Sequence, residues 1–202
     1  MLHGEQTIIL HRSLPIAANV IHVGRVAELF DKGKAAVAVI EVRTSLIDGD
    51  LLCTNRYSMF LRGAGGFGGD PGPGRQDSTP DRDPDLVLTI PTLPQQALLY
   101  RMSGDRNPLH SDPALAARAG FERPILHGQC WYGMTCKAVI DACLDGDVSA
   151  VGSWSARFAG SVYPGETLIV SCWKDQDRWL VESKVGQRNA AALVGGVLTL
   201  RS

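Results

Sequence analysis

Residues 100–110, YRMSGDRNPLH, bring an acid and an imidazole together within one short stretch. Asp105 and His110 flank Asn107 and Pro108, and Asp, Asn and Pro are residues that build tight turns. One interpretation is therefore a turn stabilised by its own side chains, with an incidental surface histidine. The other is a catalytic turn, in which a carboxylate and an imidazole hold one water molecule between them for general acid–base chemistry. Histidine titrates near neutral pH, which suits that use.

A second group with chemical potential is the glycine of PILHGQC, residues 124–130. His127 and Gly128 open a long run that is typical of a buried helix, so the Gly128 N–H belongs to the unpaired first turn. Such a donor, aided by the helix dipole, suits an oxygen that gains negative charge. Glycine also lets a substrate approach the backbone. The alternative is a glycine that serves only close packing at the helix start.

The elements that must position these groups differ between the two halves of the chain. Residues 5–61 contain four runs rich in Val, Ile and Thr, separated by turn signals, which predict antiparallel strands. Residues 63–85 are loaded with Gly, Pro and Asp and predict a linker or a long surface loop. A phosphate-binding loop is the alternative, but the segment lacks both GxxxxGK[ST] and a strand-to-helix context.

The second half predicts helices followed by strands. Short helices are expected at residues 95–104 and 112–120, and a longer one at residues 127–144. The longest is apolar almost all round and carries Gly128 and Gly133, so we expect a buried helix that a sheet approaches closely. Four strand-like runs follow it.

Taken with PILHGQC, the block YRMSGDRNPLHSDPALAARAGFER closely resembles the signature of the MaoC-like, or hydratase 2, family of (R)-specific enoyl-CoA hydratases. LHGEQ, LFDKGK and ARFAGSVYPGETL extend the resemblance over nearly the whole chain in order. It implies an α+β hot-dog fold, built as a double hot dog with a long antiparallel sheet around a buried helix. We expect an incomplete N-terminal half of strands only at residues 1–62, a linker at 63–94, and a C-terminal catalytic hot dog at 95–202.

The resemblance implies reversible addition of water to a trans-2-enoyl-CoA, giving a (3R)-3-hydroxyacyl-CoA, in fatty-acid or steroid side-chain β-oxidation. By matching positions, Asp105 and His110 are its acid/base pair, Asn107 orients them, and Gly128 receives the thioester oxygen. Substrate contacts are implied for His3, Gly4, Lys32, Arg106, Pro108, Leu109 and Phe158. No metal and no cofactor are implied, because the CoA thioester that is the substrate already activates the double bond.

Several alternatives stay open on the sequence alone. Lys32 suits the phosphates or adenine of CoA, or is a solvated lysine in a hairpin turn. Arg157 is either a second anion contact or, more simply, part of a structural ion pair. The activity could instead be dehydration of hydroxyacyl groups on an acyl carrier protein. The chain could also be a non-catalytic subunit of a hetero-oligomeric hydratase, although such a subunit has no need of all four catalytic residues.

The family resemblance also predicts a strand and a helix before LHGEQ that this chain lacks. Without that helix, a sheet in the first half would expose a large apolar face. The chain is then a fragment, is completed by a partner chain, or has an open cleft adapted to a bulky acyl group such as a steroid. We expect a homodimer, or a hetero-oligomer with another hot-dog chain.

Composition limits the classes of partner. A formal net charge of −1 gives no reason to expect nucleic acid or an anionic membrane as a partner. No apolar run is long enough to span a bilayer. Five cysteines without zinc-site spacing predict free, buried thiols, and the cytoplasm is the expected location.

Overall fold

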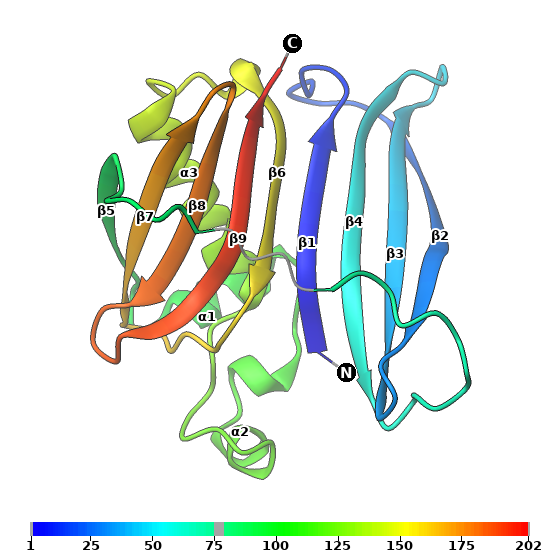
Figure 1. The fold of residues 1–202 in the computed structure, drawn as a ribbon, viewed down its shortest axis with the longest axis vertical. Coiled ribbons are helices and arrows are strands. Elements are labelled where there is room, and N and C mark those ends of the chain that lie inside the picture. The colour runs from blue at the N-terminus through cyan, green and yellow to red at the C-terminus, as the bar shows by residue number, and fades with distance from the viewer. Residues whose placement is uncertain (1, 75–78, 202) are drawn as a thin grey trace.

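One antiparallel sheet joins all nine strands of the described chain, which comprises residues 2–74 and 79–201 of this computed structural model (Figure 1). The strand order is β2-β3-β4-β1-β6-β9-β8-β7-β5. The strands are β1 (Leu2–Leu10), β2 (Val20–Asp31), β3 (Ala35–Leu46), β4 (Leu51–Arg62), β5 (Leu86–Pro91), β6 (Val151–Phe158), β7 (Thr167–Asp175), β8 (Arg178–Val185) and β9 (Ala190–Leu200). The four strands predicted in each half are therefore confirmed, and β1 joins the halves by pairing with both β4 and β6.

The helices all belong to the second half, as the sequence predicted for the described residues. They are α1 (Gln96–Tyr100), α2 (Pro113–Arg118) and α3 (Gly128–Cys143), with single 3-10 turns at Arg101–Ser103, Pro108–His110 and Val148–Ala150. In Figure 1, α3 lies behind β6–β9, whereas no described helix covers β2–β4. No helix of the described chain is long and apolar enough to cross a membrane.

The long helix α3 buries one face against the sheet. Its buried residues include Trp131 and Val139, and Tyr132 donates a hydrogen bond from its hydroxyl to the Trp154 carbonyl at 2.8 Å. The prediction that α3 is apolar almost all round, and therefore buried, holds for this face and is wrong for the opposite one. Gly133 lies on an exposed stripe that also carries the ion pair Lys137–Asp141, and nothing lies within 4 Å of where a Gly133 Cβ would be.

Strand register separates the two faces of the first half of the sheet. Since paired residues of neighbouring strands point to the same side, each row of paired residues across the sheet lies on one face. The row on the α3 side is largely apolar beyond Gln6 and runs Gln6–Tyr57–Ile40–Val26. The next row, on the opposite side, is mostly charged and runs Thr7–Arg56–Glu41–Arg25. Gln6 itself accepts a hydrogen bond at 2.6 Å from Gln129, which ties the first half to α3.

The linker crosses the sheet on the face opposite α3 (Figure 1). The Trp173 indole N–H donates to the Arg82 carbonyl at 2.9 Å and holds the linker against β7. The prediction that residues 63–94 are all linker is wrong for Leu86–Pro91, which form β5 and pair with β7. Pro91 is tolerated because it closes an edge strand, where a missing N–H costs little.

The glycines before residue 74 fold onto the β2–β3 hairpin around Asp31. Its carboxylate accepts hydrogen bonds at 2.8 Å from the N–H groups of Gly33, Gly66 and Gly68. The bond from Gly66 is the main cause that holds the pKa of Asp31 below its ordinary value. A Cβ on Gly65 would lie 2.4 Å from the Ala35 carbonyl oxygen, so only glycine allows this close approach.

All five cysteines are free, as predicted. Cys53, Cys130 and Cys172 are buried, and Cys136 and Cys143 are partly buried. Burial raises the pKa of both Cys130 and Cys136 to about 11, so these thiols remain protonated at neutral pH.

Candidate active site

The turn at residues 104–110 stabilises itself in the way its composition predicts. Gly104, with φ of 120°, ends the first 3-10 turn in a conformation that favours glycine. Asp105 Oδ1 then accepts a hydrogen bond from the Asn107 N–H at 3.1 Å, and Asn107 Oδ1 accepts one from the Leu109 N–H at 3.0 Å. Asn107 thereby caps the 3-10 turn Pro108–His110. The two interpretations of this turn do not exclude each other, since the capped turn is what directs His110.

His110 is held in one tautomer by the backbone. Its Nδ1 lies 2.8 Å from the Ile125 carbonyl oxygen, which can only accept, so the proton is on Nδ1. Nε2 therefore carries a lone pair and can act as a base. A carboxylate oxygen of Asp105, a ring nitrogen of His110 and a ring nitrogen of His127 all lie within 4.8 Å of one another. One water molecule can contact both members of the Asp105–His110 pair across such a separation.

His127 joins this cluster, and no role was predicted for it. It is 1% exposed, its Nε2–H donates to the Asp105 main-chain carbonyl at 3.1 Å, and its ring stacks on His110 at a centroid distance of 3.7 Å. Burial, and secondly the neighbouring His110, hold its pKa below the ordinary value. The sequence offered one signal for a role of His127. It lies at the start of a helix that was predicted to be buried, where an imidazole without a hydrogen-bond partner is costly.

Asp105, His110 and His127 have the residue types of a metal site. However, the two imidazole planes are stacked with an interplanar angle of only 27°. An ion in the plane of one ring then lies well outside the plane of the other, so their lone pairs do not converge. The ring geometry favours proton transfer over metal binding.

Gly128 is the first residue of α3, and its N–H is one of the donors without an intrahelical partner. A Cβ at this position would lie 3.2 Å from Cε1 of Phe158, so the absence of a side chain on Gly128 leaves space between the helix start and that ring. Phe158 meets His3 edge-on at 4.9 Å and Trp131 at 5.1 Å. It therefore stands between the helix start and the N-terminal end of β1.

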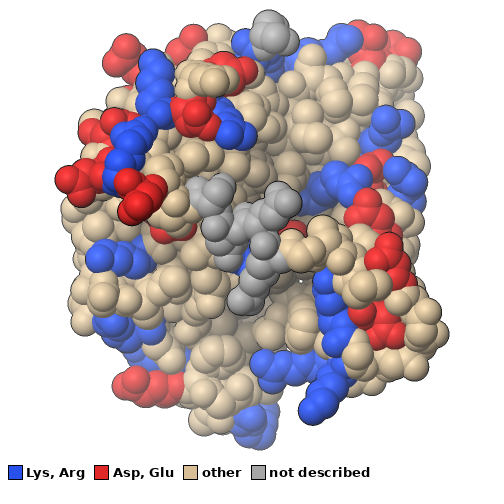
Figure 2. Space-filling model, in the orientation of Figure 1, with Lys and Arg blue, Asp and Glu red and all other residues tan. Residues whose placement is uncertain are grey.

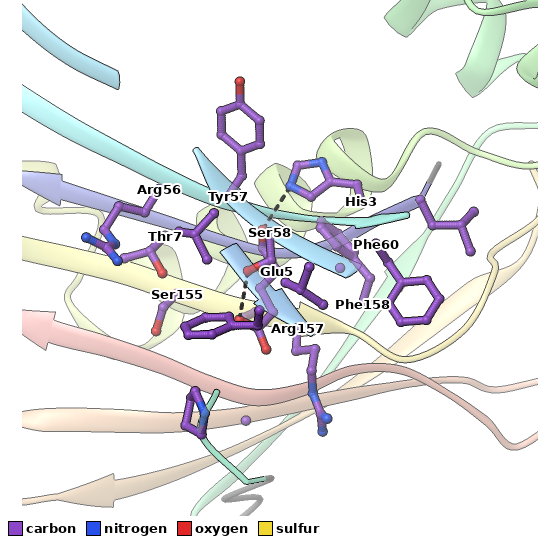
Figure 3. A pocket seen from close by; sticks show the side chains of 18 of the residues that line it. His3, Glu5, Thr7, Arg56, Tyr57, Ser58, Phe60, Ser155, Arg157 and Phe158 are labelled. Carbon is purple, nitrogen blue, oxygen red and sulfur yellow. Dashed lines mark hydrogen bonds between the residues drawn. The ribbon is translucent and has the colours of Figure 1, made fainter. Parts of the chain in front are cut away.

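A cleft of about 910 Å³ is lined in part by Phe158, and Thr7, Arg56 and Ser155 line it from the sheet face opposite α3. Four of the predicted substrate contacts line it, namely His3, Gly4, Lys32 and Phe158. Figure 3 shows His3 and Tyr57 projecting on one side of the strands and Arg157 on the other. In Figure 2, basic side chains mixed with acidic ones lie over the β2–β4 half of the face that the linker crosses. The charged residues lining the cleft are Glu5, Glu28, Lys32, Arg56 and Arg157.

The structure does not bring all predicted contacts to this cleft. Arg106, Pro108 and Leu109 are not among its lining residues and lie on the turn, where Arg106 and Pro108 are exposed. Lys32 lines the cleft, but its ammonium donates to the Pro71 carbonyl and, at 3.5 Å, to the Pro73 carbonyl. Lys32 is therefore an exposed residue of the β2–β3 hairpin turn, as one alternative had it, whose ammonium is held by linker carbonyls. Arg157 also lines the cleft.

Comparison with known proteins identifies the family of the chain. Residues 75–195 match the model of the MaoC like domain, and residues 1–63 match that of the MFE-2 hydratase 2 N-terminal domain. The chain is 51% identical to enoyl-CoA hydratase ChsH3 of Mycobacterium tuberculosis, over 98% of this chain and 69% of the relative. It is 46% identical to the peroxisomal enoyl-CoA hydratase 2 of Arabidopsis thaliana, over 98% and 67%.

A solved structure shows the same fold. The crystal structure of a MaoC-like dehydratase from Phytophthora capsici matches with a TM-score of 0.93 and 31% identity, and covers 100% of this chain and 72% of that one. The chain thus spans about two thirds of the length of the two curated relatives. The double hot-dog architecture predicted from the sequence is confirmed by this similarity.

Proposed function

Because the chain belongs to the MaoC-like, hydratase 2 family, we propose that it adds water to trans-2-enoyl-CoA and forms (3R)-3-hydroxyacyl-CoA. The observation that carries the proposal is the Asp105–His110 pair. The turn holds a carboxylate oxygen of Asp105 and a ring nitrogen of His110 within 4.8 Å of each other, beside the start of α3. Relatives named enoyl-CoA hydratase support the substrate class. The place of this step is β-oxidation of a fatty acyl or steroid side chain.

The geometry supports a hydration in which the protein supplies proton transfer and charge stabilisation. A water molecule between the pair loses a proton to it as the water oxygen bonds to Cβ. The pair returns one proton to Cα, so one water molecule is added in total. Negative charge that develops on the thioester oxygen is stabilised by the Gly128 N–H. Asp105 and His110 act as a coupled pair, so the two protons are not assigned to separate residues.

The cleft beside Phe158 is the proposed position of the CoA moiety. It borders the ring that lies beside the helix start. Lys32 and Arg56 line it, with Lys32 held by linker carbonyls and Arg56 paired with Glu28 and Glu41, so a phosphate group would have to compete with these partners. Arg106, Pro108 and Leu109 are proposed to contact the substrate from the turn side. The proposed reaction uses no metal and no cofactor, since the thioester polarises the double bond.

The cytoplasm remains the proposed location. The supporting observation is that five cysteines stay unpaired, as is usual in a reducing compartment. Association with a second hot-dog chain, as a homodimer, is proposed from the uncovered apolar face of the first half of the sheet.

Loss of the enoyl-thioester absorbance band tests the function directly. Asp105→Asn and His110→Gln are each expected to lower kcat by roughly 10²- to 10⁴-fold, the usual contribution of general acid–base catalysis. The control is Asp112→Asn. Asp112 accepts hydrogen bonds from Ala114 and Leu115 as the cap of α2, and asparagine preserves a cap.

Two results would contradict the proposal. One is full hydration activity in both Asp105→Asn and His110→Gln. The other is a faster reaction of the wild-type protein with acyl-carrier-protein thioesters than with CoA thioesters, which would favour a carrier-protein dehydratase. A panel of short, long and steroid-linked enoyl-CoA esters then defines the acyl group.

A further inference from the structure

His127 is buried more completely than its place at the N-cap of α3 requires. It is 1% exposed, and the rings of Tyr100 and His110 lie against it at centroid distances of 4.9 Å and 3.7 Å. An aliphatic side chain would fill this space without the cost of burying a polar ring. The imidazole is therefore expected to serve something other than packing.

The contacts of His127 define one protonation state. The Asp105 carbonyl can only accept, so the proton of a neutral His127 is on Nε2. Nδ1 is buried and has no hydrogen-bond partner among the described residues, so a second proton there would be unsatisfied. The titratable and charged groups around the ring are His110, Asp105, Tyr100 and Arg101, and burial together with His110 lowers its pKa.

We propose that His127 is a positioning residue for the Asp105–His110 pair, an inference that rests on the proposed hydratase function. Its Nε2–H holds the backbone of Asp105, and its ring face supports the ring of His110. The same side chain thus sets the position of both members of the pair. His110 is fixed from its other edge by the Ile125 carbonyl at 2.8 Å. A neutral His127 does so without placing a positive charge beside a histidine that must accept a proton.

Two substitutions separate the two contacts. His127→Phe keeps a flat ring for the stack and removes the donor, whereas His127→Gln keeps an N–H donor and removes the ring. Each is expected to lower kcat by roughly 10- to 100-fold, because a small misplacement of catalytic groups has effects of that size. KM should change by less than about threefold, since the lost interaction acts mainly in the transition state.

The matched control is Val139→Ala, a packing loss on the same helix at a residue that is fully buried. It should lower the melting temperature and leave kcat and KM close to those of the wild type. Wild-type kcat in a folded His127→Phe protein would overturn the inference. So would a kcat loss in Val139→Ala as large as in the two His127 variants, because the loss would then follow from weakened packing.

A measurement on the unmodified protein covers the case in which neither variant folds. Side-chain ¹⁵N NMR should show His127 as the Nε2–H tautomer without titration from about pH 8 to about pH 5, the range in which free histidine becomes charged. A His127 that titrates there would overturn the inference. An inactive wild-type protein with this tautomer would instead refute the hydratase function alone.

Discussion

At the scale of single residues, the room around Gly128 decides what can reach the start of α3. In Gly128→Ala, the new methyl group meets Cε1 of Phe158 at 3.2 Å, and the ring must shift by a few tenths of an ångström. The methyl group also occupies the space next to the N–H that is proposed to receive the thioester oxygen. We expect kcat/KM for enoyl-CoA hydration to fall at least tenfold, as for loss of part of an oxyanion hole.

Gly133→Ala is the control for Gly128→Ala, because it makes the same change on the same helix in open space. Alanine in a helix interior should raise the free energy of unfolding by about 0.5–1 kcal/mol and leave activity unchanged. Thermal or chemical unfolding and the hydration assay measure both effects. Equal activity of the two variants would show that the Gly128 backbone is not approached by substrate.

Local spacing was sufficient to predict where the candidate site residues lie, whereas their roles were implied by the family resemblance. Asp105, Asn107 and His110 share one turn, and Gly128 opens a recognisable helix, so short-range patterns predict where each lies. His127 was missed because its contacts join two segments, the turn and the helix start, that only the tertiary fold brings together. The engagement of Lys32 by the linker carbonyls could not be predicted for the same reason.

At the scale of elements, the glycine-rich segment after β4 depends on one carboxylate. Asp31→Asn weakens three backbone hydrogen bonds, because a neutral amide oxygen is a poorer acceptor than a carboxylate. We expect faster amide hydrogen exchange and faster proteolysis at residues 63–74, with the sheet unaffected. Asp48→Asn is the control, since Asp48 accepts one weaker bond, at 3.3 Å, in the neighbouring hairpin.

Acid should act on the same segment as Asp31→Asn. The folded state lowers the pKa of Asp31 below 3.8, so its ionised form stabilises the fold. This contribution to stability is fully present when the pH is above the ordinary pKa of Asp31. It is lost as the pH falls through the lower pKa of the folded state. Hydrogen exchange at residues 63–74 should therefore accelerate in the wild type only below about pH 4. An identical acid response in Asp31→Asn would contradict the role of Asp31.

Patterns along single elements predicted the strands and α3 but not how exposed each face is. Alternating β-branched residues identified all eight predicted strands, because the period of two is a local property. Strand β5 was missed because six residues ending in Pro91 follow a segment rich in Pro and Asp. The exposed stripe of α3 was missed because Gly133 and Ala142 do not distinguish an open face from a closely packed one.

At the scale of the whole molecule, one sheet has a covered half and an uncovered half. Strand β1 connects them, and the apolar row that starts at Gln6 beside α3 continues to the edge strand β2. There Val26 is 63% exposed and Leu29 is 50% exposed. Strand order and long-range pairing of this kind are not encoded in local periodicity, so the family resemblance predicted an open face in the first half but not which residues form it.

That face should mediate the proposed homodimer, because association removes apolar surface from water. Sedimentation velocity of the wild type is expected to show a concentration-dependent dimer. Val26→Lys places a charge in the buried interface and should give a monomer at all concentrations. As a monomer its stability should lie within about 0.5 kcal/mol of the wild type, since the side chain is exposed on the sheet edge.

Val23→Lys provides the matched control, because Val23 is 62% exposed on the same strand but faces the opposite side, paired with Arg43. It makes the same chemical change with the same loss of strand propensity, and should dimerise as the wild type does. Equal dimerisation of the Val23 and Val26 variants would show that the apolar face is not the interface. A wild-type chain that stays monomeric throughout would refute the homodimer itself, while leaving the turn, the helix start and the proposed hydration untouched.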